Sequence, residues 1–151
     1  MNKLTQEAPQ FLRGRMFNRD NARPKEQRIL VLKTGIAGLK YNIENEDEQK
    51  ALESITPGTE LMLFREPDNE HDVWAIAVYL TEEDKLGFIS RFKNETIARL
   101  MDAGKKFVGI VDDPGVDKEA QEIVEKELRR NRQAPTENMA VPFSVYLVEE
   151  G

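Results

Sequence analysis

The residues best suited to chemistry lie in one short polar segment between two apolar stretches. Arg65, Asp68, Asn69, His71 and Asp72 fall within eight consecutive positions, and His71 is the only histidine of the chain. Carboxylate and amide oxygens accept hydrogen bonds from hydroxyl groups, and a guanidinium offers a planar fork of donors that matches phosphate. The segment therefore predicts a polar loop that binds a ligand.

The same segment lacks a recognisable catalytic or metal-binding pattern. A hydrolytic triad needs a serine whose base is a histidine, and the chain has no Gly-x-Ser-x-Gly turn and no Gly-x-x-x-x-Gly-Lys-Ser/Thr phosphate loop. One histidine and no cysteine are too few for zinc. A calcium or magnesium site on Asp68 and Asp72 is a weaker alternative to a polar ligand-binding loop. An EF-hand loop that begins at Asp68 would need glycine at the position of Val73. We expect no enzyme activity, no cofactor and no metal.

Composition limits the class of protein. The 151 residues suit one domain, and the net charge of −6 argues against a protein that coats nucleic acid through general basicity. Residues 1–27 differ, with six basic and three acidic groups, a net charge of +3. They predict a flexible basic N-terminal arm. No apolar run approaches the roughly 20 residues that span a bilayer, so we expect a cytoplasmic protein with no membrane partner.

The elements that must position the polar loop are short and mostly extended. Runs rich in branched and aromatic residues predict strands at 28–33, 60–65, 74–80, 85–89, 107–111 and 143–148. Helical periodicity predicts helices at 44–55, 94–103 and 116–132, with Asn94 as an N-cap. We expect a mainly β fold, a closed six-stranded OB-like or SH3-like antiparallel β-barrel with two or three peripheral helices.

One ordered set of motifs resembles the HIRAN domain family. It consists of Arg65-Glu66-Pro67-Asp68-Asn69 with Asp72, then Ala75-Ile76-Ala77-Val78, then Lys85-Leu86-Gly87-Phe88-Ile89, and the run at 34–41 resembles the family's opening strand. The resemblance covers about residues 28–111. It implies a modified OB-like barrel over 28–151 that carries an inserted helix at about 116–132. Family members occur fused to SNF2-type helicases and as stand-alone prokaryotic proteins, and the fused ones capture the 3′ end of single-stranded DNA.

The resemblance also implies roles for individual residues. Asp72 would accept a hydrogen bond from the terminal 3′-hydroxyl, and Asn69 would help to hold that end. Tyr41 would stack on a base, Lys40 would meet a phosphate, and Phe88 would lie beside the terminal nucleotide. A carboxylate accepts from a hydroxyl but repels a phosphate, so such a site would select an unphosphorylated end.

Three positions depart from the pattern of the DNA-binding members. Asp68 stands where asparagine is common and adds negative charge to the expected site. Lys40 replaces an arginine and loses its bidentate geometry. Asn42 replaces a second aromatic residue and removes a stacking surface.

Structural alternatives stand beside the binding roles. Asp72 could serve only to cap the amides of its own loop, and Arg65 could be an ion-pair partner rather than a phosphate contact. A basic rim around Asp72 would favour DNA. Its candidate members are Lys33, Lys40, Arg65, Arg91 and Lys93.

The predicted function is a nucleic-acid-binding module that recognises 3′-hydroxyl ends of single-stranded DNA in repair or replication processing. The expected partners are such an end and a helicase or another repair protein. The alternative is a non-catalytic adaptor that docks on a protein through the helix at 116–132.

Overall fold

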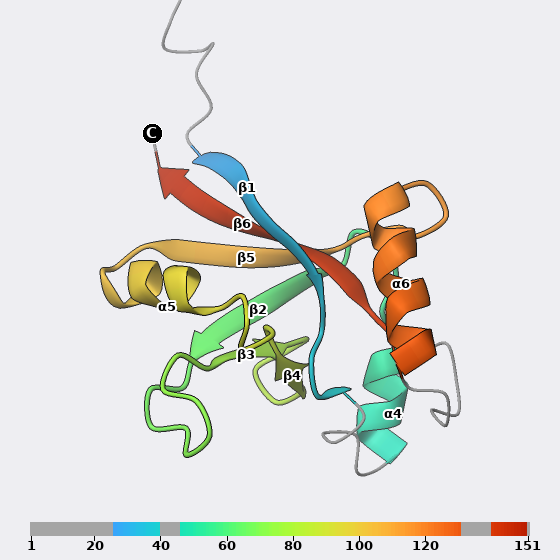
Figure 1. Cartoon of the computed structure of the whole chain (residues 1–151), viewed down its shortest axis with the longest axis horizontal. Coiled ribbons are helices and arrows are strands. Elements are labelled where there is room, and N and C mark those ends of the chain that lie inside the picture. Colours follow the sequence, from blue (N-terminus) through green and yellow to red (C-terminus); the bar gives the residue numbers. More distant parts are fainter. Residues whose placement is uncertain (1–25, 40–45, 131–139, 151) are drawn as a thin grey trace, which may run out of the picture. The chain divides into compact units, whose positions relative to one another are not determined.

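The computed structural model describes residues 26–39, 46–130 and 140–150, apart from the side chains at 47, 48, 128 and 130. The strands are β1 (Glu26–Gly35), β2 (Glu60–Arg65), β3 (Ile76–Tyr79), β4 (Lys85–Phe88), β5 (Lys106–Val111) and β6 (Pro142–Glu150). The helices are α4 (Glu46–Glu53), α5 (Glu95–Asp102) and α6 (Lys118–Arg130) (Figure 1). Each predicted element is confirmed to within a few residues. Lys40, Tyr41 and Asn42 lie outside the described residues, as does all but the end of the predicted arm.

The strands form one antiparallel sheet in the order β1-β6-β5-β2-β3-β4. The mainly β fold with three helices is therefore confirmed, but the expectation of a closed barrel is wrong, because among the described residues no ladder joins the two edges, β1 and β4. Within the described chain, they meet at one isolated bridge, where Ala37 and Phe88 each donate a backbone N–H to the other's carbonyl, at 2.8 and 2.9 Å. The chain then turns at Gly38, whose φ is 72°, so the pairing ends there.

Gly87 makes this bridge possible. A Cβ at this position would overlap the carbonyl oxygen of Ala37 and lie 2.8 Å from Cγ2 of Ile36. We expect Gly87→Ala to force the edges apart and to lower the free energy of unfolding by about 1–3 kcal/mol, as overpacking does. Urea denaturation measures this loss. Gly115→Ala is the control, because its new Cβ would meet only the end of the Asp113 side chain, and an equal loss there would contradict the expectation.

The core lies along the sheet and beneath α5. Leu61, Ile76, Val78, Phe143 and Val145 are fully buried. They come from β2, β3 and β6, and their side chains belong to one buried cluster although β5 separates β6 from the other two strands in the sheet. This packing fixes the ends of β2 and β3, and those ends carry the polar loop.

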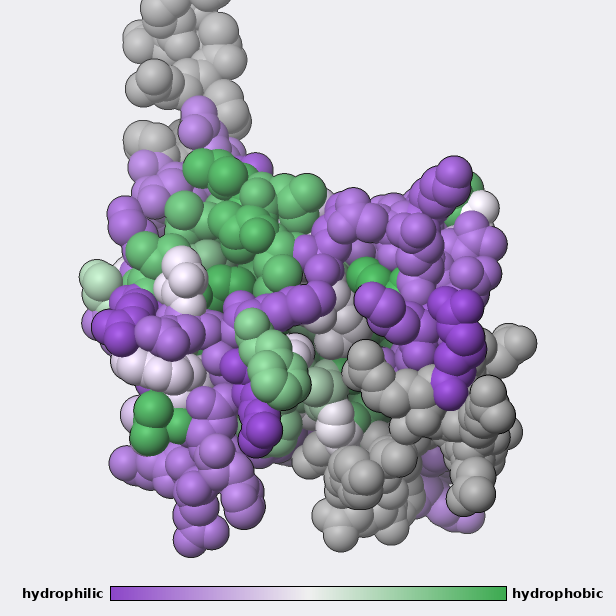
Figure 2. Space-filling view, viewed as in Figure 1, coloured by the Kyte–Doolittle hydropathy of each residue, from purple (hydrophilic) through white to green (hydrophobic). Residues whose placement is uncertain are grey.

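The first half of β1 is an exception to this burial pattern. Ile29, Leu30 and Val31 are each more than 40% exposed, and Figure 2 shows apolar side chains gathered over this part of the surface. β1 is an edge strand, so it has a neighbour on one side only. Its branched residues therefore favour the strand without joining the core.

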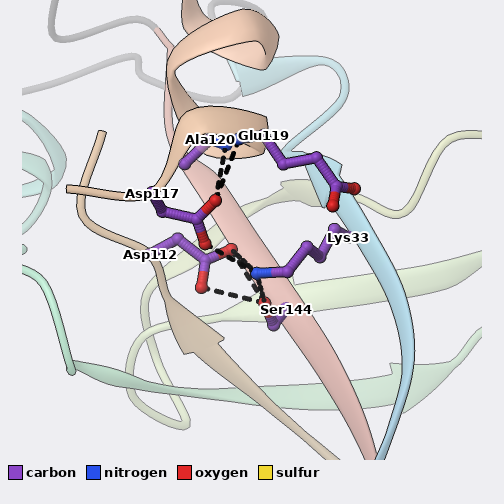
Figure 3. A network of polar contacts seen from close by, with 6 residues as sticks. All are labelled: Lys33, Asp112, Asp117, Glu119, Ala120 and Ser144. Carbon is purple, nitrogen blue, oxygen red and sulfur yellow. Dashed lines mark hydrogen bonds and ion pairs between the residues drawn. The ribbon is translucent and has the colours of Figure 1, made fainter. Parts of the chain in front are cut away.

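A polar network anchors α6 to the sheet (Figure 3). Lys33 of β1 donates from Nζ to Oδ2 of Asp117 at 2.7 Å and to Oγ of Ser144 at 3.1 Å. The Ser144 hydroxyl lies 2.8 Å from both carboxylate oxygens of Asp112. One lysine thus connects β1, β6 and the residue that precedes α6.

No helix in the described part of the chain is long and apolar enough to span a membrane.

Asp117 has two functions in this network. Its Oδ1 accepts from the backbone N–H groups of Glu119 and Ala120, at 3.0 and 3.2 Å, so it caps α6. Its Oδ2 holds Lys33. The hydrogen bond from Lys33 lowers the pKa of Asp117, and the same bond raises the pKa of Lys33 against the opposing effect of burial.

These shifts predict how the anchoring of α6 depends on pH. A lowered Asp117 pKa stabilises the fold above about pH 4, and this contribution is lost as the pH falls through the lowered value. A raised Lys33 pKa stabilises below about pH 10 and is lost as the pH rises through the raised value. We expect Asp117→Asn, which can still cap the helix, to melt below wild type at pH 7, and we expect this gap to narrow as the pH falls below about 4.

Thermal denaturation followed by circular dichroism from pH 3 to pH 9 measures this difference. Glu119→Gln is the matched control, because it also removes one carboxylate near the start of α6 while the network uses only the Glu119 backbone. A gap between Asp117→Asn and wild type that stays constant across this range would contradict the ion pair as its cause.

Candidate functional site

The loop between β2 and β3 is held by its own polar side chains. Oδ1 of Asn69 accepts from the backbone N–H groups of His71 and Asp72, at 2.9 and 3.1 Å. Oδ1 of Asp72 accepts from the backbone N–H of Trp74 at 2.9 Å. Short side-chain acceptors of this kind replace backbone partners in tight turns. The structural alternative, that Asp72 caps loop amides, is thus observed.

The second oxygen of Asp72 is tied to a buried amide. Oδ2 accepts from Nδ2 of Asn94 at 2.7 Å. Asn94 is 1% exposed, and its Oδ1 has no partner among the described residues. It holds the predicted N-cap position of α5, but its side chain makes no capping bond. Each carboxylate oxygen of the half-buried Asp72 has further lone-pair capacity, so the group can still accept from a hydroxyl.

A chain of contacts brings Phe88 to the same loop. Nδ2 of Asn69 donates to Oε1 of Glu66 at 3.1 Å, and Nζ of Lys85 donates to Oε2 at 2.7 Å. Lys85 Nζ also lies 4.4 Å from the ring centroid of Phe88. Burial acts to raise the pKa of Glu66, but the hydrogen bonds from Lys85 and Asn69 lower it overall. The predicted residues Asn69, Asp72 and Phe88 are therefore part of one linked region.

Arg65 is directed into the protein. Its Nε and Nη2 donate to the two carboxylate oxygens of Asp102 at 2.9 and 3.2 Å. Its Nη1 and Nη2 donate to the carbonyls of Ala75 and Val73 at 2.6 and 3.0 Å. The hydrogen bond from Arg65 lowers the pKa of Asp102. The ion-pair alternative for Arg65 is thus observed, and its phosphate contact stays a prediction.

The remaining predicted residues are scattered. Asp68 and His71 are exposed on the loop. Lys40 and Tyr41 fall outside the described residues, so the structure does not place them. Lys33, a candidate member of the basic rim around Asp72, instead belongs to the polar network that anchors α6.

A cleft of about 450 Å³ opens beside this region. Three segments line it: residues 34–38 after β1, the loop from Ser90 to Lys93, and α6. Among the described lining residues, the side chains that carry charge or an aromatic ring are Phe92, Lys93, Lys126 and Glu127.

Phe92 is the residue that the sequence analysis missed. It is 83% exposed, and the guanidinium of Arg91 lies 5.2 Å from its ring centroid. An exposed ring beside a cation is a suitable surface for stacking a nucleic-acid base. The run Arg91-Phe92-Lys93, which begins three positions after the end of β4, is the signal that could have indicated it.

Two segments of the chain link the loop to the cleft. Ala37 lines the cleft and pairs with Phe88, whose ring lies against Lys85. Lys93 lines the cleft and precedes Asn94, which holds Asp72. The loop and the cleft are thus connected through neighbouring residues of the chain.

The one serine–lysine pair in the network is unsuited to nucleophilic catalysis. Ser144 is fully buried, and the pKa of Lys33 is raised chiefly by its bond to Asp117, so this lysine is a poor base. In the described parts of the chain, no three His, Cys, Asp or Glu side chains form a group that could hold a metal ion.

Fold and site together define a binding domain built on an open antiparallel sheet. The chain belongs to the HIRAN domain family, whose model matches residues 29–119. The HIRAN domain is known as a DNA-binding module and is not catalytic by itself.

Two solved structures resemble the chain in fold. A protein from Lactobacillus plantarum shares 22% identity at a TM-score of 0.61, covering 83% of this chain and 99% of that one. The HIRAN domain of human HLTF shares 16% identity at a TM-score of 0.53, covering 82% and 80%. Among curated proteins there is no significant match.

Proposed function

We propose that this protein binds single-stranded DNA and recognises its 3′-hydroxyl end at Asp72. The observation that carries the proposal is the environment of that carboxylate. The Trp74 amide and the Asn94 side chain hold it in one position, and it remains half-exposed with capacity for another donor. A terminal hydroxyl can donate to it, whereas a terminal phosphate would be repelled.

The surroundings of Asp72 supply what the rest of a strand needs. Phe88 lies in the same linked region, and the adjoining cleft offers Phe92 and two lysines. Family membership supports DNA as the ligand. With the helicase-fused members as the guide, the proposed setting is DNA repair or replication, beside a helicase or another repair protein.

The packing of α6 makes the adaptor alternative the weaker one. Ala120 is fully buried, Ile123 and Val124 are half-buried, and Cγ2 of Ile123 would lie 3.1 Å from a Cβ placed on Gly35. The apolar face that would dock on a partner is thus already used inside this domain.

Fluorescence anisotropy tests the proposal with oligonucleotides of one sequence that differ only at the 3′ end. We expect a strand with a free 3′-hydroxyl to bind at least about tenfold more tightly than one with a 3′-phosphate, the effect of one charge-assisted hydrogen bond. A blunt duplex should bind more weakly than the single strand. Equal affinity for the two 3′ ends would overturn end recognition at Asp72.

A further inference from the structure

The helix α6 lies almost entirely beyond the family match, which ends at residue 119, yet it forms one wall of the cleft. This wall is fixed rather than loosely attached. Ile123 packs against Gly35, and the Lys33–Asp117 ion pair holds the start of the helix. One wall of the cleft therefore lies outside the residues that match the family model.

The charged side chains that line the cleft favour an anion. Lys93 and Lys126 are exposed, and neither has an ion-pair partner among the residues that the structure describes. Among the described residues that line the cleft, Glu127 is the one carboxylate, so their three charged side chains give a net charge of +1. Because the whole chain carries −6, this local excess of positive charge is distinctive.

The cleft also offers a surface for stacking. Phe92 extends into solvent with Arg91 beside its ring. The combination of an exposed ring with cations on both sides of a groove is how proteins hold single strands without reading their sequence. Other anions, such as free phosphate, would use the lysines but would leave the ring without a partner.

We propose that this cleft binds the part of a single strand upstream of its 3′ end, with a base on Phe92 and phosphates at Lys93 and Lys126. This inference rests on the proposed function, since the strand enters the cleft from the Asp72 loop. The two places are joined through Asn94 and through the bridge between Ala37 and Phe88. α6 would then extend the binding site beyond the terminal nucleotide.

Anisotropy with 3′-hydroxyl oligonucleotides of about two and about eight nucleotides tests the inference, since OB folds bind roughly 4–16 nucleotides. We expect Phe92→Ala to weaken binding of the longer strand about tenfold and to leave the shorter one nearly unchanged. We expect Lys126→Gln to reduce the slope of log affinity against log salt by about 0.7, the loss of one phosphate contact. Phe92→Tyr should retain the affinity of wild type.

Lys118→Gln is the matched control, because it removes the same charge from the same helix at a position that does not line the cleft. Equal effects of Lys118→Gln and Lys126→Gln, or normal binding of the longer strand by Phe92→Ala, would overturn the cleft proposal. If 3′-end discrimination persists in that case, recognition at Asp72 stands alone. If the cleft variants behave as expected but both 3′ ends bind equally, end recognition at Asp72 fails, and the cleft binds single strands without reference to their 3′ end. A protein that binds no oligonucleotide overturns both.

Discussion

Asp72→Asn is expected to abolish the preference for a 3′-hydroxyl while leaving the fold almost intact. The new amide oxygen can accept from the Trp74 N–H as the carboxylate does. The new amide nitrogen would face Asn94, whose Oδ1 has no partner in the described chain. A rotation of the Asn94 amide pairs the two groups, so we expect the free energy of unfolding to change by no more than about 1 kcal/mol.

Binding should respond far more strongly than stability. The variant loses the charged acceptor for the terminal hydroxyl, so affinity for a 3′-hydroxyl strand should fall about tenfold or more. Affinity for a 3′-phosphate strand should rise, because the repelling charge is gone. The ratio of the two affinities, measured by anisotropy, should approach about one.

Asp68→Asn separates this local effect from a general change in charge. Asp68 lies on the same loop but is exposed, and removing it takes away one negative charge without disturbing Asp72. We expect both strands to bind somewhat more tightly and the ratio between them to persist. An unchanged ratio in Asp72→Asn would show that this carboxylate is only a loop cap.

The sequence predicted the order of the elements well because each has a strong local signal. β2 alternates apolar residues that face the core, such as Leu61 and Leu63, with others that do not, and turns separate the strands. Closure of the sheet was not predictable in this way. It depends on how far the segment after β1 follows β4, and the turn at Gly38 ends that contact after Ala37.

The site was predictable as a motif but not as a set of contacts. The spacing of Asn69 and Asp72 indicated a loop, yet Asn94 is 22 positions away from Asp72 along the chain, and no local pattern links them. Arg65 looked equally suited to phosphate and to an ion pair, and only the position of Asp102 on α5 decides which contact forms. The cleft depends on where α6 packs, so the sequence alone could not place Lys126 in a binding site.

Arg65→Ala is expected to produce the largest loss of stability among single changes near the loop. The side chain is 11% exposed and donates four hydrogen bonds, two of them to the carbonyls of Val73 and Ala75. Without the guanidinium, the Val73 carbonyl loses its donor, while Ala75 keeps only the N–H of Glu66. Losing these two charge-assisted bonds should lower the free energy of unfolding by about 2–4 kcal/mol, measurable by urea denaturation.

The contribution of Asp102 to this loss should be the smaller part. Its side chain is 48% exposed, so water can replace the guanidinium, and Asp102→Asn should cost much less than Arg65→Ala. Arg99→Ala is the matched control, because it removes an exposed arginine that pairs with Glu95 on the same helix and lies over the same Trp74 ring. If Arg65→Ala proves no more destabilising than Arg99→Ala, the guanidinium does not hold the loop. The charge of Arg65 would then be available to a phosphate.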